Sequence, residues 1–255
     1  MNDTKQRGKR MTKTHRSSEK QIQQNLKRAK RYFIQKINTN FGESDYCAHL
    51  TYASWDRPDT KEVADRDLEN FLRKLKRECK KQKLDPLKYV AVMEYGETAD
   101  GKMKNIHFHV ILSGQLPREF IEESWRARRR KGEKKGRRRG MINVDRLQPD
   151  EYGLEALARY LTKKKGILDE KKWHCSKNLK KPTIRKNDYK YSHRKLETLA
   201  GQTDCPVVWQ QLYPGYLLTE AVSTYSQEGG WHITVKMRRD RFAKNRYTGH
   251  AARSE

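Results

Sequence analysis

Long apolar runs are missing from this chain of 255 residues, of which only 34% are hydrophobic. A membrane-spanning helix needs about 20 consecutive apolar residues, and no stretch of the sequence approaches that length. The first residues are polar and basic, so no secretory signal peptide is expected to open the chain. These absences argue against a membrane partner and indicate a cytoplasmic protein.

Cysteine is scarce as well, and its four residues are widely spaced with no Cys-x-x-Cys pair. Such spacing is typical of free thiols in a reducing compartment rather than of a disulfide framework. One alternative is a zinc site built from two histidines and two cysteines, namely His174, Cys175, His193 and Cys205.

Acidic residues are too few to balance the basic ones. The chain has 58 Lys or Arg against 32 Asp or Glu, which gives a formal net charge of +26 and a sequence pI near 9.9. A field of this sign and size attracts polyanions, of which nucleic acid is the usual one. A charge that serves only solubility is a weaker explanation, because self-repulsion at this magnitude opposes compaction.

The length allows one substantial domain with appendages. Residues 1–17 have no hydrophobic periodicity and are predicted to be a basic flexible arm. Residues 18–200 are predicted to form the main domain, and residues 201–255 a β-hairpin and basic tail packed on it. The predicted helices are 18–40, 65–80 and 149–165, and the predicted strands are 46–52, 88–96, 104–113, 141–145, 216–225 and 231–238.

Two segments are strongly basic. Residues 126–139 hold ten Lys or Arg in fourteen positions, and residues 171–194 mix cations with aromatic side chains. The first segment is predicted to be a solvated loop that also contacts phosphates, and the second suits single-stranded nucleic acid through stacking and phosphate neutralisation. The candidate DNA-binding residues are Arg128, Arg129, Arg130, Arg137, Arg138, Arg139, Lys177, Lys180 and Lys181.

A β-hairpin is predicted around Asp100-Gly101, because both central positions of a type I′ turn need positive φ. This turn fixes the register of the two strands. The predicted pairs are Glu97 with Lys104, Glu94 with His107, and Val92 with His109.

Glu94, His107 and His109 then share one face of the hairpin, and the other face is almost wholly apolar. Two neutral imidazoles and a carboxylate can hold a divalent cation and leave positions open for substrate. If the turn slips, Glu97 replaces Glu94 as the third ligand. A structural zinc site is less favoured because no fourth ligand is obvious nearby.

Tyr160 lies at the border of the buried stripe of the predicted helix 149–165, with Lys163 and Lys164 three and four residues on. The simplest interpretation is a border tyrosine with its ring on the core and its hydroxyl in water. Beside a metal-bound phosphodiester, such a hydroxyl becomes a candidate nucleophile, and an adjacent lysine favours its phenolate.

Three segments together resemble the HUH endonucleases, and in particular the single-tyrosine rolling-circle replication initiator (Rep) proteins of small phages and plasmids. Residues 48–52 (Ala-His-Leu-Thr-Tyr) resemble the family's first strand motif. Residues 106–110 (Ile-His-Phe-His-Val) resemble its histidine-hydrophobe-histidine motif. Residues 160–164 (Tyr-Leu-Thr-Lys-Lys) resemble its tyrosine motif, and the order along the chain is that of the family.

The resemblance implies an α+β fold, a ferredoxin/RRM-like five-stranded antiparallel sheet with flanking helices. It implies Mg²⁺ or Mn²⁺ on His107, His109 and a carboxylate. It also implies that Tyr160 attacks single-stranded origin DNA in a bacterial host cytoplasm, keeps the 5′ phosphate and leaves a 3′ hydroxyl. No Gly-x-x-x-x-Gly-Lys-Ser/Thr motif occurs, so unwinding is expected to come from a host helicase and the host replication machinery.

Three other functions stay open at this point. A transposase or relaxase would use the same chemistry on another DNA partner. A nuclease that uses water as its nucleophile would cut DNA without becoming attached to it. A non-enzymatic nucleic-acid-binding protein would need only the charge, with the histidines in structural roles.

Overall fold

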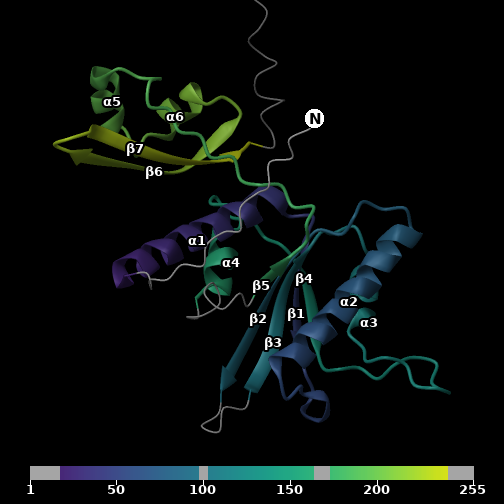
Figure 1. Ribbon diagram of the computed structural model, residues 1–255. Coiled ribbons are helices and arrows are strands. Elements are labelled where there is room, and N and C mark those ends of the chain that lie inside the picture. The colour runs from purple at the N-terminus through teal and green to yellow at the C-terminus, as the bar shows by residue number, and fades with distance from the viewer. Residues whose placement is uncertain (1–17, 98–102, 164–172, 241–255) are drawn as a thin grey trace, which may run out of the picture.

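The computed structural model describes residues 18–97, 103–163 and 173–240, and it shows an α+β fold around a five-stranded antiparallel sheet (Figure 1). The strand order is β4-β1-β3-β2-β5, which confirms the predicted sheet. The strands are β1 Tyr46–Thr51, β2 Tyr89–Glu97, β3 Met103–Leu112, β4 Ile142–Arg146 and β5 Trp173–Cys175. The helices of this part are α1 Glu19–Asn40, α2 Lys61–Lys81, α3 Arg118–Ser124 and α4 Glu155–Leu161, with a short 3₁₀ helix at Ser54–Asp56.

Helices cover both faces of the sheet. The sequence β1-α2-β2-β3-α3-β4 is the β-α-β-β-α-β arrangement of ferredoxin-like folds, to which β5 adds an edge strand beside β2. Figure 1 shows α2 and α3 on one side of the strands and α1 and α4 on the other. Because strand side chains alternate, Phe108, Val110 and Leu112 of β3 enter the core under α2, whereas Ile111 enters the core under α1 and α4.

Helices α1 and α2 confirm the hydrophobic periodicity of the sequence. Ser18 is the N-cap of α1, where its hydroxyl accepts a hydrogen bond from the Gln21 N–H at 3.3 Å. Thr60 caps α2, which therefore begins four residues before the predicted start. The apolar side chains of the predicted stripe are all buried: Leu68, Phe71, Leu72 and Leu75.

The helix that carries Tyr160 is shorter than predicted. It begins at Glu155, not at Pro149, because the preceding residues form a turn in which Asp150 and Gly153 bond to each other and Gly153 has φ +75°. Positive φ is incompatible with a helix, and glycine adopts it without strain. Helix α4 ends at Leu161, and the expected extension beyond residue 163 lies outside the described residues.

The C-terminal part forms a second, smaller layer. The helices α5 His193–Ala200 and α6 Pro206–Leu212 pack on the hairpin of β6 Tyr216–Ser226 and β7 Gly230–Arg239, and this hairpin confirms the predicted one. Trp209 is fully buried there. Residues 193–240 hold five Lys or Arg and five Asp or Glu, so the net charge of the chain comes from the rest of it.

Membrane and thiol expectations can be compared with the part of the chain that is described. None of its helices combines the length and the apolar character needed to cross a bilayer. All four cysteines are free, as predicted. The predicted basic arm 1–17 and the basic tail 241–255 lie outside the described residues.

Candidate metal and tyrosine site

Three histidines from two neighbouring strands meet on the sheet face that α1 and α4 cover. In the antiparallel pairing of β1 with β3, His49 lies directly opposite His109, and Thr51 lies opposite His107. The ring centroids of His49 and His109 are 4.7 Å apart and nearly parallel, and His107 meets both edge-on at 5.1 and 5.2 Å. One nitrogen from each ring falls within 4.8 Å of the other two, so the three rings could hold one metal ion.

Glu94 of β2 completes the cluster. The pairing of β2 with β3 confirms the predicted register, with Glu94 opposite His107 and Val92 opposite His109. Glu94 Oε2 lies 2.8 Å from His107 Nε2 and 3.4 Å from His109 Nε2. Neighbouring ligands that each lie about 2.1 Å from an octahedral ion are about 3 Å apart, so these separations suit a shared cation.

The surroundings keep the imidazoles neutral. Burial, followed by the neighbouring His49 and His107, lowers the pKa of His109 to about 4. Burial and His107 also lower the pKa of His49, although Glu94 opposes this shift. At neutral pH both rings therefore carry a free lone pair, which is the form that binds a metal.

His109 Nε2 provides a second test of the fit to a metal ion. It is a buried nitrogen without a hydrogen-bond partner, although Glu94 Oε2 lies at 3.4 Å, because the geometry of that contact is not that of a hydrogen bond. A buried polar atom left unsatisfied costs about 1–3 kcal/mol. A cation bound at this nitrogen would remove that cost, so the donor set fits a metal.

A β-bulge in β3 orients His107. Between the pairs Glu94–His107 and Gly96–Lys104, the two residues Asn105 and Ile106 oppose the single residue Tyr95. Asn105 has φ +51°, and its carbonyl oxygen lies 2.8 Å from His107 Nδ1. If Nδ1 donates its proton to this carbonyl, Nε2 is directed toward the cluster, as in metal sites whose second ring nitrogen is held by a backbone acceptor.

The bulge also corrects the predicted pairing of Glu97 with Lys104. The inserted residue shifts the register by one position, so that Glu97 lies opposite Met103 and Gly96 lies opposite Lys104. The turn residues Asp100 and Gly101 lie outside the described part of the chain.

Asn105 gives a prediction on stability. Asn105→Val is expected to lower the free energy of unfolding by about 1–2 kcal/mol, because a β-branched residue tolerates positive φ poorly whereas asparagine and glycine accept it. Asn105→Gly, the matched control, is expected to stay close to the parent protein. Urea unfolding of the three proteins measures the difference, and equal losses for both variants would contradict a backbone origin.

Tyr160 of α4 lies beside the histidines. Its ring centroid is 5.6 Å from that of His109, with the two planes almost perpendicular, and 58% of the residue is exposed. Ala158 and Leu161 hold α4 on the core shared with α1, which fixes the position of the tyrosine. The structure thus brings a solvent-accessible phenol next to a cluster that suits a metal ion.

The two lysines expected beside Tyr160 are only partly described. Lys163 is exposed, and its backbone N–H donates to the Tyr160 carbonyl at 3.1 Å. Within the described residues its ammonium makes no ion pair. Lys164 lies outside the described residues.

The candidate DNA-binding cations fall into separate groups. Arg128, Arg129 and Arg130 are exposed in the loop between α3 and β4, whereas the side chains of three other arginines bond to carboxylates: Arg137 to Asp56, Arg138 to Glu123, and Arg139 to Asp56 and Asp67. Lys177, Lys180 and Lys181 are exposed after β5, beyond the Tyr89 end of β2. They lie at the opposite end of the sheet from His107, so the structure does not bring them to the cluster.

His49 is the functional candidate that reasoning from the residues missed as a ligand. The signal was present, because His49 alternates with the buried Ala48 and Leu50 and must therefore face the other side of its strand. The alternative zinc set is not supported: in the described part of the chain, the three histidines are the one group of potential ligands close enough together to hold an ion.

Comparison with known proteins locates this site within one family model. Neither the curated proteins nor the solved structures contain a match to the chain. Residues 45–165 match the family described as replication-associated protein ORF2/gene 2 protein, and this segment carries the three histidines, Glu94 and Tyr160. The segment that holds the site is therefore similar to the replication-associated proteins of this family, which supports a role of the chain in the initiation of replication.

Proposed function

We propose that this protein is a metal-dependent DNA nickase and strand-joining enzyme that initiates rolling-circle replication, with Tyr160 as its nucleophile. The observation that carries the proposal is the position of the Tyr160 ring, 5.6 Å from the ring of His109. An isolated tyrosine has many structural uses, but an exposed phenol beside a cluster of metal-binding type suits attack on a phosphodiester.

His49, His107, His109 and Glu94 would hold the ion. A bound divalent cation would polarise the phosphoryl oxygens and stabilise the charge that develops on them. Because imidazole nitrogen outnumbers oxygen in this set and Mg²⁺ prefers oxygen ligands, the set favours Mn²⁺ over Mg²⁺.

In the proposed step, Tyr160 Oη forms a bond to phosphorus as the bond from phosphorus to the 3′ oxygen breaks. The phenol proton is lost to solvent, and the departing 3′ oxygen takes up a proton to become a hydroxyl. The DNA 5′ phosphate then stays on the tyrosine. Because the new ester replaces the old one, a 3′ hydroxyl can attack it in the reverse direction and rejoin the strand.

The net charge of +26 supports single-stranded origin DNA as the substrate. A priming 3′ hydroxyl would pass to the replication machinery of the host, with strand separation by a host helicase. A transposase or relaxase would use the same chemistry, and the family of residues 45–165 favours replication over either.

A covalent-trapping assay tests the proposal. The protein is incubated with a pool of labelled single-stranded oligonucleotides in Mn²⁺ or in chelator and then denatured. We expect a labelled protein band that requires the metal. Cleaved DNA without an attached protein would instead indicate hydrolysis by water, and binding without cleavage across a pool that includes the origin would indicate a nucleic-acid-binding protein.

A further inference from the structure

The basic segment 126–139 forms a closed arm. Its two ends pair through hydrogen bonds from Ala127 N–H to the Arg137 carbonyl (2.8 Å) and from Arg139 N–H to the Trp125 carbonyl (3.3 Å). Gly136 permits this approach, because a Cβ there would lie 2.0 Å from the Ala127 oxygen. The arm therefore has a paired stem next to the sheet and a tip around residues 128–134.

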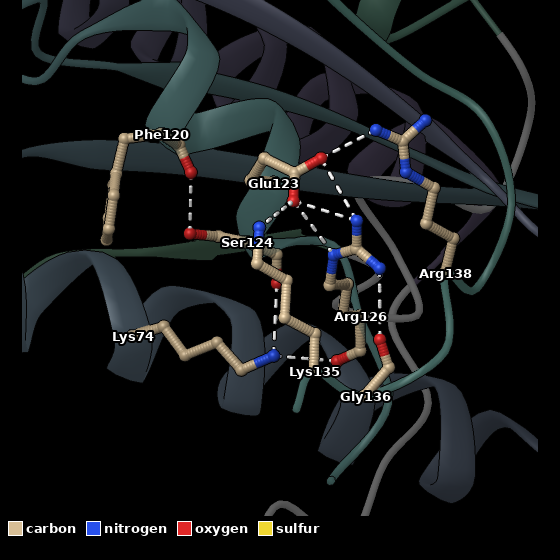
Figure 2. Close-up of polar contacts among 8 residues, drawn as sticks. All are labelled: Lys74, Phe120, Glu123, Ser124, Arg126, Lys135, Gly136 and Arg138. Carbon is tan, nitrogen blue, oxygen red and sulfur yellow. Dashed lines mark hydrogen bonds and ion pairs between the residues drawn. The ribbon is translucent and has the colours of Figure 1, made fainter. Parts of the chain in front are cut away.

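Glu123 of α3 gathers the cations of the stem (Figure 2). Its carboxylate bonds to Arg126 at 2.7 Å, to Arg138 at 2.6 Å and to Lys135 at 3.4 Å. Hydrogen bonds from Arg138 and then Arg126 lower the pKa of Glu123 to about 2, so the carboxylate is ionised throughout the neutral range.

Further contacts tie the stem to the domain. Arg137 and Arg139 each bond to Asp56, at 2.9 and 2.8 Å, and Arg139 also contacts the buried carboxylate of Asp67. Lys74 of α2 donates to the carbonyls of Ser124 and Arg126 (Figure 2). The stem is thus fixed from both sides by groups of the folded core.

The tip differs from the stem. Its cations are exposed and make no ion pair with any described residue: Arg128, Arg129, Lys131 and Lys134. Carboxylates neutralise the stem and leave the tip charge available, which is the distribution expected of a surface that binds an anion.

The arm also starts close to the histidine cluster. Ala53 N–H donates to the Arg139 carbonyl, two residues beyond Thr51, which lies opposite His107. Two residues of extended strand span about 7 Å. The root of the arm is therefore within a few nucleotides of a phosphodiester bound at the site.

We infer that the arm is a pre-formed guide for the sugar–phosphate backbone of the DNA that flanks the scissile link, and that Glu123 is the positioning residue that holds it in place. The inference rests on the proposed function for the identity of the ligand. Its consequence is unusual: removal of a negative charge at Glu123 should weaken the binding of a polyanion, because the gain in attraction is smaller than the cost of ordering a released arm.

The test compares two glutamates one turn apart on α3. Glu123→Ala and Glu119→Ala change the charge equally, but Glu119 is exposed and no bond joins it to the arm. Affinity for a mixed-sequence single-stranded oligonucleotide is measured against salt concentration, in chelator and in a Tyr160→Phe background. We expect Glu123→Ala to bind about 3- to 10-fold more weakly, and Glu119→Ala to bind at least as tightly as the parent.

Two further variants separate positioning from charge. Gly136→Ala leaves the charge unchanged but opens the stem, so it should reproduce the loss seen in Glu123→Ala. Arg128→Ala with Arg129→Ala should reduce the slope of log affinity against log salt by about two. Tighter binding by both glutamate variants, or an unchanged slope, would overturn the inference. No step of the test needs cleavage, so failure of the nickase proposal would appear separately.

Discussion

Tyr160→Phe is expected to eliminate the covalent protein–DNA adduct and to lower strand cleavage at least about a thousandfold, because phenylalanine keeps the ring and removes the attacking oxygen. The fold should be unaffected, since the Tyr160 hydroxyl makes no hydrogen bond to any described residue and 58% of the residue is exposed. DNA affinity in chelator should change by less than about threefold, because only one polar atom is removed. Denaturing gels measure the adduct, and fluorescence anisotropy measures the binding.

Tyr152→Phe is the matched control. Tyr152 is also exposed and precedes Tyr160 by eight residues, but it lies in the turn before α4. The neighbouring Glu151 raises the pKa of Tyr152, which disfavours its phenolate. Adduct formation should therefore persist in Tyr152→Phe. Loss of the adduct in this variant, with retention in Tyr160→Phe, would assign the nucleophile to the other tyrosine.

The sequence predicted best where local rules decide the structure. The hairpin register that places Glu94 opposite His107 followed from a turn motif and from strand alternation, both of which depend on neighbouring residues. The same reasoning failed at Glu97, because a bulge with Asn105 at positive φ inserts one residue into β3. Simple alternation carries no information about such an insertion.

The parts that sequence reasoning did not reach depend on long-range contacts. His49 joins the cluster only because β1 pairs with β3, and nothing local to residues 46–51 specifies that partner. The arm gives a second example: its arginines appear equivalent in sequence, but Glu123 and Asp56 bind some of them and leave others exposed. A count of charges therefore predicted the kind of partner but not the residues that are free to meet it.

Replacement of a cluster histidine is expected to cost more in metal binding than in stability. His49→Ala and His109→Ala should each lower metal-dependent cleavage at least about a hundredfold, since loss of an outer-shell partner alone costs about 10- to 100-fold. Mn²⁺ affinity, measured by electron paramagnetic resonance without DNA, should fall in parallel. His232→Ala, in the exposed part of the C-terminal hairpin, is the control and should change neither quantity.

His109→Phe separates a metal ligand from a structural histidine. In chelator, His109 Nε2 is buried without a hydrogen-bond partner, so an apolar ring of similar shape removes an unsatisfied atom and can still stack on His49. The variant should unfold at the same temperature as the parent or higher, although its cleavage is lost. A marked fall in melting temperature would show instead that the imidazole stabilises the fold. Functional sites commonly sacrifice stability in this way, and a metal-binding role for His109 predicts that trade-off at this position.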